Sequence, residues 1–222
     1  MNRTTLPVIA TAVLLTASLQ AVAGGATKQE QPVYGQTSTD CSVVLPFEGN
    51  RPQIEDGSAL LIRTANGVTA IVSMPTPATG TYCYPPATLA TNSAAGPAVP
   101  GYPEVFTLWF IYFNNPAGCA PSGCGVPDVL GANCVNAQAG AMKLAGHVTG
   151  GGNLQLSGHA SKGDGPLGAL GCAAFTNIEG AEIHLAVAPH GVLQPSLMPA
   201  LIQVPPGGGP GYWYPAVFGP IN

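Results

Sequence analysis

Apolar side chains occupy almost every position from Val105 to Phe113, and only Thr107 interrupts them. A strand with both faces buried has this pattern, because its side chains alternate between faces and neither face meets water. The β-branched and aromatic content favours a strand over a buried helix, and Asn114-Asn115-Pro116 then ends the element. We therefore predict a central buried strand whose aromatic rings pack in the core instead of forming a ligand platform.

A hairpin is predicted over residues 59–74, where two apolar segments flank Asn66-Gly67. Asn and Gly tolerate the positive φ angles of a two-residue type I′ turn, which would set the register of both strands. The pairs expected in this register are Thr64 with Thr69, Ile62 with Ile71 and Leu61 with Val72.

A second hairpin is predicted over residues 142–160, with its turn centred on Gly151. One face would be apolar, with Leu144 opposite Gly158 and Gly146 opposite Leu156, so that large residues meet small ones. That face comprises Met142, Leu144, Gly146, Val148, Leu154, Leu156, Gly158 and Ala160. The other face would be solvated and carries Lys143, His147, Thr149, Gln155, Ser157 and His159.

The remaining pattern predicts short strands and long connections. Residues 180–187 alternate, with Ile183, Leu185 and Val187 directed inward, Glu182 and His184 outward, and a turn following at 189–191. Shorter strands are predicted over 42–47 and 201–204, and an extended surface loop over most of 75–103. Taken together, these elements predict an all-β protein, an antiparallel β-sandwich with long Pro/Gly-rich loops.

Composition supports this fold class. The chain has 30 glycines and 23 prolines in 222 residues, which implies many turns and argues against a helical bundle. Only 7% of the residues are charged, which suits a neutral secreted surface or a self-assembling one. The net charge of −4 becomes more negative if Arg3 is removed with a leader, and this acidic balance argues against nucleic acid as a partner.

The N-terminus has the features of a secretory signal peptide over residues 1–23: a positive start, a short apolar core and the small residues Ala21-Val22-Ala23. No cysteine is present there to receive a lipid, and no later apolar segment is long enough for an integral membrane helix. We expect a secreted or periplasmic protein of bacterial type. Residues 24–40 would form a flexible arm, 41–204 the sandwich, and 205–222 a tail whose Tyr212, Trp213 and Tyr214 cover an open end of the core.

Six cysteines follow the predicted leader, and an oxidising compartment would pair them as three disulfides. Cys119 and Cys124 close the shortest loop, so they are the best-supported pair. The further pairs that we expect are Cys41 with Cys83 and Cys134 with Cys172. A zinc site at Cys119 and Cys124 is disfavoured because no second closely spaced pair follows.

Candidate chemistry is sparse. The four histidines His147, His159, His184 and His190 are the weak candidates for a metal site, and a composite of one hairpin histidine with His184 stays open. Ser157, His159 and Asp164 contain the residue types of a hydrolytic triad, but Ser157 and His159 would point the same way from one strand and nothing marks an oxyanion hole. Motifs for nucleotides, zinc proteases and calcium loops are missing, so we assign no catalytic residue and expect no cofactor.

Several segments resemble a family of uncharacterised secreted bacterial proteins. They are RTANGV (63–68), TLWFIYFNNPAGC (107–119) with CG (124–125), AGHVTG with GNLQLSGH (145–159) and GAEIHLAVAPHG (180–191). The last segment is also faintly similar to CHRD-type β domains, but it has Ala188-Pro189 where those domains have a tighter turn. The resemblance implies an exported all-β fold and brings no catalytic residue with it.

Three functional hypotheses follow. The first is a secreted or periplasmic binding or structural module, in which an envelope or extracellular surface component is the partner to test. The second is a small extracellular hydrolase or metal-dependent enzyme that uses His147, His159 or His184. The third, motivated by the low charge, is a protein of envelope or matrix assembly.

Overall fold

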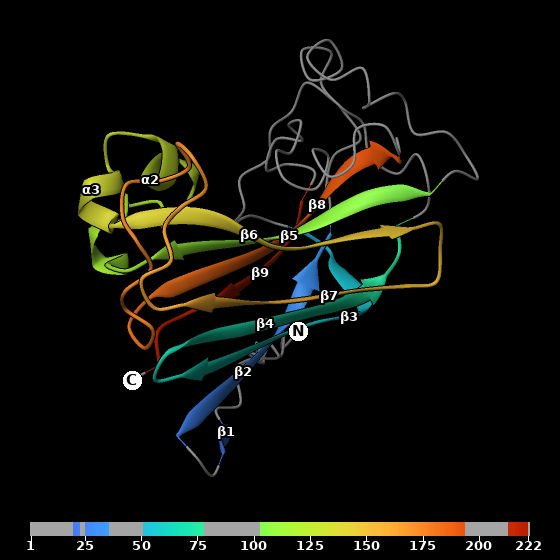
Figure 1. The fold of residues 1–222 in the computed structure, drawn as a ribbon, viewed down its shortest axis with the longest axis horizontal. Coiled ribbons are helices and arrows are strands. Elements are labelled where there is room, and N and C mark those ends of the chain that lie inside the picture. Colours follow the sequence, from blue (N-terminus) through green and yellow to red (C-terminus); the bar gives the residue numbers. More distant parts are fainter. Residues whose placement is uncertain (1–19, 23–24, 36–50, 78–102, 194–212, 222) are drawn as a thin grey trace, which may run out of the picture.

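The computed structural model describes residues 20–22, 25–35, 51–77, 103–193 and 213–221, and these form two antiparallel sheets packed face to face (Figure 1). The five-stranded sheet has the order β1 (Gln20–Val22), β2 (Ala26–Tyr34), β3 (Gln53–Thr64), β4 (Gly67–Pro75) and β7 (Asn153–Ser161). The four-stranded sheet has the order β6 (Ala139–Thr149), β5 (Glu104–Phe113), β8 (Glu182–Val192) and β9 (Tyr214–Phe218). The predicted antiparallel β-sandwich is confirmed.

Strand β5 is buried over its whole length, as its sequence predicts. Phe106, Leu108, Phe110 and Tyr112 point between the sheets and join the main core with side chains of both sheets. The opposite face of β5 contributes to a second apolar cluster, because a small helical cap covers it. A strand with a core on each side has no solvent-facing position, which explains why Thr107 is the single polar residue between Val105 and Phe113.

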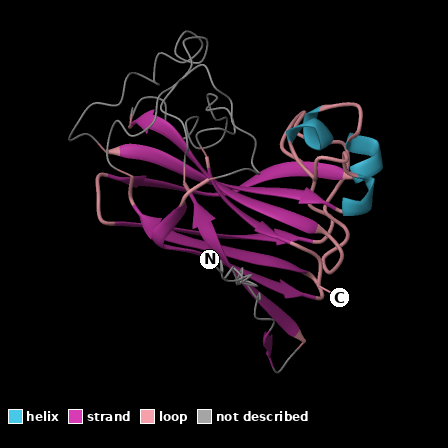
Figure 2. Cartoon of the chain, turned by 180° about the vertical axis from the view of Figure 1, so that it is seen from behind, coloured by secondary structure: helices cyan, strands magenta, loops and turns pink. Residues whose placement is uncertain are grey.

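The cap consists of residues 116–137 and covers one end of the outer face of the four-stranded sheet. It contains the 3₁₀ turn η1 (Pro116–Gly118) and the helices α2 (Val126–Leu130) and α3 (Cys134–Ala137), which lie together at one end of the strands (Figure 2). A disulfide joins Cys119 to Cys124 within the cap, and a second joins Cys134 to Cys172 in the loop after β7. Both are the pairs expected from the sequence, whereas Cys41 and Cys83 lie outside the described residues.

The first hairpin exists as β3 and β4, but its predicted register is wrong by two residues. Thr64 pairs with Gly67 and Ile62 with Thr69, so the turn consists of Ala65 and Asn66. Neither Asn66 nor Gly67 has a positive φ. Gly67 is needed instead for close packing, because a Cβ there would collide with the Ala160 carbonyl and the His159 ring of β7. A shift of two residues keeps each side chain on its predicted face.

The second predicted hairpin is not a hairpin. Strand β6 pairs with β5 and strand β7 pairs with β4, so the chain crosses from one sheet to the other between them (Figure 1). Leu144 and Gly158 are in contact as predicted, but they pack between the two sheets and are not paired within one hairpin. Leu154, Leu156 and Ala160 are buried as predicted, while Gly146 is exposed.

Strand β8 is longer and more buried than its sequence suggests. The strand continues through Pro189 and His190 to Val192, where a turn was expected, and its register with β5 is irregular there. Proline is tolerated because β9 pairs with β8 only as far as Val187 within the described ranges. Ile183, Leu185 and Val187 point inward as predicted, but His184 is fully buried, so its predicted outward exposure is wrong.

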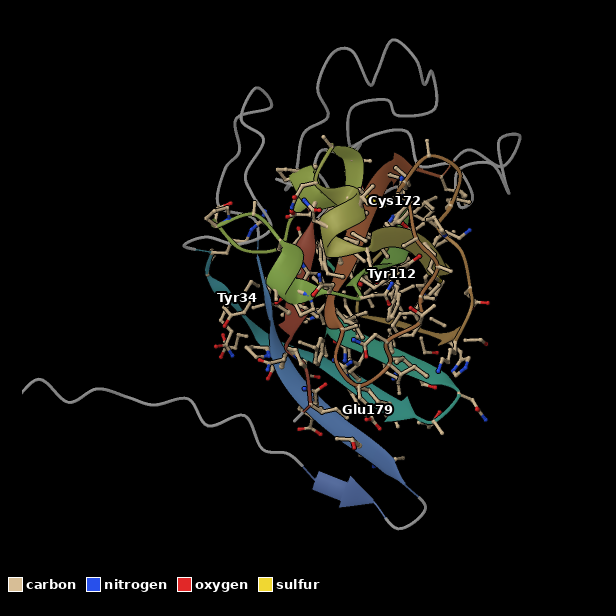
Figure 3. The ribbon with its side chains drawn as sticks, turned by 90° about the vertical axis from the view of Figure 1, so that its left-hand side faces the viewer. Tyr34, Tyr112, Cys172 and Glu179 are labelled. Carbon is tan, nitrogen blue, oxygen red and sulfur yellow. A yellow bond between two sulfur atoms is a disulfide. The ribbon has the colours of Figure 1, made fainter. Side chains whose placement is uncertain are left out.

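Both termini contribute strands, which corrects two predictions. The segment expected to be a flexible arm contains β2, and the tail placed outside the sandwich contains β9. Residues 20–22 of the predicted signal peptide form β1 beside the first residues of β2 (Figure 3). The tail supplies cover as expected, since Tyr214 is buried and Trp213 packs on both cores. The strands predicted over 42–47 and 201–204, and Tyr212, lie outside the described residues.

Candidate functional site

The four histidines lie apart on three strands. His147 on β6 and His159 on β7 are exposed, and Nδ1 of His159 lies 3.1 Å from the Thr69 hydroxyl of the neighbouring strand. His184 and His190 are both on β8 and both buried. In the described part of the chain, no three side chains of the types His, Cys, Asp and Glu come together as a metal site would require. The zinc alternative at Cys119 and Cys124 is excluded, because these two sulfurs are bonded to each other.

Each buried histidine has a polar partner on the same sheet. Nε2 of His184 lies 2.7 Å from Oε1 of Glu182, and its ring packs on Phe113 with the ring centroids 5.0 Å apart. Nε2 of His190 lies 2.7 Å from the Thr107 hydroxyl. Because both rings are buried, neither can reach a substrate in solution, and their contacts serve to stabilise the fold.

The three residue types of the hydrolytic triad are not arranged as a triad. Ser157 and His159 are exposed on the same face of β7, and the imidazole turns to Thr69. Asp164 accepts a hydrogen bond from the Ser161 backbone at 2.7 Å and so closes the turn after β7. In a working triad the acid contacts the base and the base contacts the nucleophile, and Ser157, His159 and Asp164 do not make these contacts.

The outer face of the four-stranded sheet holds a stacked pair of tryptophans. Trp109 and Trp213 have ring centroids 5.9 Å apart and planes inclined by 11°. In β8 the neighbouring outer-face residues are Ala186 and Ala188, whose small side chains leave room for two indole rings. Trp109 is only 1% exposed, so the predicted core role of this aromatic side chain is confirmed.

Arg63 seals one end of the space between the sheets. It is 1% exposed, and its guanidinium donates to the carbonyls of Ile178, Ala181 and Gly219 and to the Gln29 side chain. Burial lowers the pKa of Arg63 to about 10. Sequence reasoning missed this role, although a charged residue at an inward position of an alternating strand is a readable signal.

A second buried group of ionisable residues lies where the two sheets meet near Trp213. Arg51 donates to the carbonyls of Trp213 at 2.8 Å and Gly35 at 3.3 Å, so it links the start of β3 to β9. Burial raises the pKa of Tyr214, Glu104 raises it further, and Arg51 opposes both effects. Arg51 and Glu104 are also buried, and this set braces the two sheets against each other.

The two asparagines of the FNNP segment, Asn114 and Asn115, join the end of β5 to the segments around it. The Asn114 side chain donates to the carbonyls of Gln138 and Ala174 and accepts from the backbone nitrogens of Thr176 and Asn177. The Asn115 side chain donates to the carbonyl of Asn136 in α3. Asparagine suits position 114 because its one amide group both donates and accepts.

Asp128 holds the cap together from inside. It is fully buried, and its carboxylate accepts from the backbone nitrogens of Ala120 and Gly125, each at 2.9 Å, and from the Asn133 side chain. Together with the Cys119–Cys124 disulfide, these bonds give two short helices a defined position that their length alone would not sustain.

Two aliphatic side chains protrude from this rigid cap. Leu130 is 60% exposed and Val135 is 73% exposed, at the end of α2 and in α3 respectively. Asp128, which is buried, is the single charged residue between 114 and 142, so the outer surface of the cap carries no charge. We use the name cap surface for Leu130 and Val135 together with α2 and α3, the helices in which they lie. The sequence alone did not predict this surface.

Comparison with known proteins gives no assignment: no family model, curated protein or solved structure matches this chain. Within its described residues, no helix has the length and apolar character needed to cross a membrane.

Proposed function

We propose that this protein is a secreted or periplasmic β-sandwich that works as a binding or structural module and recognises its partner through the cap surface. The observation that carries the proposal is the exposure of Leu130 and Val135 on a cap that two disulfides hold in place. Large aliphatic side chains in a fixed, uncharged setting are a common feature of interaction sites.

The rigidity of the cap favours binding. Asp128 and the Cys119–Cys124 bridge order the helices before any partner arrives, so less conformational entropy is lost on association. The absence of charge between 114 and 142, apart from buried Asp128, argues for a neutral partner such as a glycan or an apolar protein surface of the cell envelope.

The polar groups of the described sandwich support this role over catalysis. Asp128, Asn114 and Arg63 are the best-connected polar side chains, and each is buried in contacts that fix the fold. A catalytic group must reach its substrate, whereas these groups are enclosed by the protein.

Export is the cellular setting that the proposal requires. Disulfides persist in oxidising compartments, and the first 23 residues have the composition of a signal peptide. Mass spectrometry of the exported protein tests this part, and a chain that begins at Gly24 is the expected result. A chain that retains residues 1–23 would contradict it.

The binding role is tested with immobilised glycans and with envelope fractions. The variant L130S/V135S should lose any interaction that the unaltered protein shows, by about tenfold or more, because two exposed apolar contacts are removed. L167S is the matched control, since Leu167 is 39% exposed and lies outside the cap. Equal binding by all three proteins, at equal thermal stability, would overturn the assignment of the cap surface.

A further inference from the structure

The outer edge of β2 is only partly covered. Strand β1 pairs with Ala26, Thr27 and Lys28, and no other described strand lies beside β2 on that side. From Gln29 onward the edge therefore presents backbone groups that a further strand can bind. Figure 3 shows β2 running along the side of the molecule, with β1 at its lower end.

The strand that covers this edge belongs to the predicted leader. Gln20, Ala21 and Val22 form β1, and cleavage after Ala23 would remove them. Among the described residues, no strand would then pair with the outer edge of β2 in the exported protein. This step rests on the export that we propose above.

Strand β2, which forms this edge, is held in an extended conformation by contacts on its inner face. Gln29 points between the sheets, where its side chain accepts from Arg63 and donates to the Gly219 carbonyl at 3.1 Å. Lys28 pairs with Ile62 and Glu30 with Leu60, so their side chains lie on the opposite, outer face of the sheet. An edge that is already ordered requires little rearrangement when another strand binds it.

The sequence of β2 is complementary to itself. In an antiparallel pair of two copies centred on Gln29, Lys28 of each copy lies opposite Glu30 of the other, on the same outer face. Centring the pair on residue 28 or on residue 30 would instead place like charges opposite each other. Pro32, which has no backbone N–H to donate, falls opposite Ala26 at the two ends of this pairing and so does not interrupt its centre.

We propose that two copies of the exported protein associate through their β2 edges, antiparallel and centred on Gln29, so that their sheets join into one continuous sheet. The joined sheet contains β2, β3, β4 and β7 of each copy, with the two β2 strands side by side at its centre. The contact is small, so the dimer forms and dissociates readily with concentration.

The first test is sedimentation analysis of the exported protein over a range of concentrations. A chain that begins at Gly24 should show a reversible monomer–dimer equilibrium, and the uncleaved chain should dimerise more weakly because β1 occupies part of the edge. Mass spectrometry on the same sample separates the two proposals. A retained leader contradicts the proposed export, whereas a correctly cleaved chain that stays monomeric at every concentration overturns the dimer.

Charge reversal gives a sharper test. K28E places one glutamate opposite another in both halves of the pair, and E30K places one lysine opposite another, so each variant alone should dimerise about tenfold more weakly or worse. The double variant K28E/E30K restores opposite charges and should recover the affinity. A mixture of the two single variants should form a heterodimer, because the chain with two acidic residues then meets the chain with two basic ones.

The pattern of rescue identifies the register. Recovery in the double variant and in the mixture requires residues 28 and 30 of different copies to be neighbours, which no structural role within one copy would produce. Loss in the single variants without recovery in either rescue would overturn the proposed pairing. Unchanged dimerisation in all of these variants would place the contact elsewhere and overturn it as well.

Discussion

Leu144 of β6 packs directly against Gly158 of β7, although the two residues belong to different sheets: a Cβ at position 158 would lie only 2.6 Å from the Leu144 Cβ. The contact sets how closely the sheets approach at this point. It also shows that the sequence between them is a crossover from one layer to the other.

Gly158→Ala should therefore destabilise the protein by about 1–3 kcal/mol, because the added methyl group has no space and the sheets must separate or Leu144 must move. Urea unfolding followed by intrinsic fluorescence measures the change. Gly165→Ala is the control, since a Cβ there meets nothing within 4 Å and its φ is not positive. Equal effects of the two substitutions would contradict the close packing.

The two disulfides should contribute unequally to stability. The Cys119–Cys124 pair is separated by 5 residues and the Cys134–Cys172 pair by 38, so loop closure predicts about 2 kcal/mol for the first and about 4 kcal/mol for the second. Replacing Cys119 and Cys124 with serine should loosen the cap and leave the sandwich folded, as hydrogen exchange would show. Global unfolding of that variant would mean that the cap is required for the second core to form.

The two adjacent asparagines of the FNNP segment, Asn114 and Asn115, should contribute unequally to stability. Asn114→Ala removes four partly buried side-chain hydrogen bonds and takes this partner from the backbone groups of Ala174, Thr176 and Asn177, which should cost about 2–4 kcal/mol. Asn115→Ala removes one exposed bond and should cost about 1 kcal/mol or less. Thermal unfolding of both variants tests the order, and a larger loss for Asn115→Ala would contradict it.

Two buried tyrosines should contribute a loss of stability as the pH rises above about 10. Burial raises the pKa values of Tyr112 and Tyr214, so the folded protein keeps two protons that the unfolded chain releases near its ordinary tyrosine pKa of about 10. Arg63 acts the other way, because its folded pKa of about 10 lies below the unfolded value and the folded state loses that proton first. Burial also lowers the pKa values of Arg51 and Lys143, so these two groups oppose the tyrosines as well. The two tyrosines alone contribute a loss of about 2.7 kcal/mol per pH unit, and the three basic groups make the net slope smaller.

Tyr214→Phe separates these contributions. The Tyr214 hydroxyl is buried and has no hydrogen-bond partner among the described residues, so the substitution should leave stability at pH 7 unchanged or slightly higher. It should also make the change of stability with pH above about 10 less unfavourable by about 1.4 kcal/mol per pH unit, since it removes one of the two tyrosine protons that the folded state keeps. Denaturant unfolding at pH 7 and at several pH values between about 9 and about 11.5 measures both effects, and an unaltered pH dependence would contradict the assignment.

Local sequence was enough to predict several elements. The two-faced burial of β5 follows from an apolar run that leaves no polar face, and the presence of a hairpin formed by β3 and β4 follows from two apolar segments around a turn, although its register does not. The pairing of Cys119 with Cys124 follows from a short loop of turn-forming residues. In each case the information lies within a short stretch of the chain.

The site could not be predicted in the same way. Burial of His184 depends on the outer face of its sheet being covered, and alternation along β8 alone does not reveal that cover. The exposure of Leu130 and Val135 likewise depends on how α2 and α3 are fixed by Asp128 and by the two disulfides. Both features are set by contacts between segments that are distant or irregular in sequence.

The sequence by itself determined the fold class, the central strand and the Cys119–Cys124 disulfide, because hydrophobic period, turn residues and loop length act locally. Only the tertiary structure decided that β6 and β7 belong to different sheets, since an apolar face that pairs within one sheet has the same pattern as one that packs between two. It also decided that the polar segment 26–34 is a strand. The inward Gln29 is retained there because Arg63, distant in sequence, supplies the hydrogen bond that makes a polar residue acceptable between the sheets.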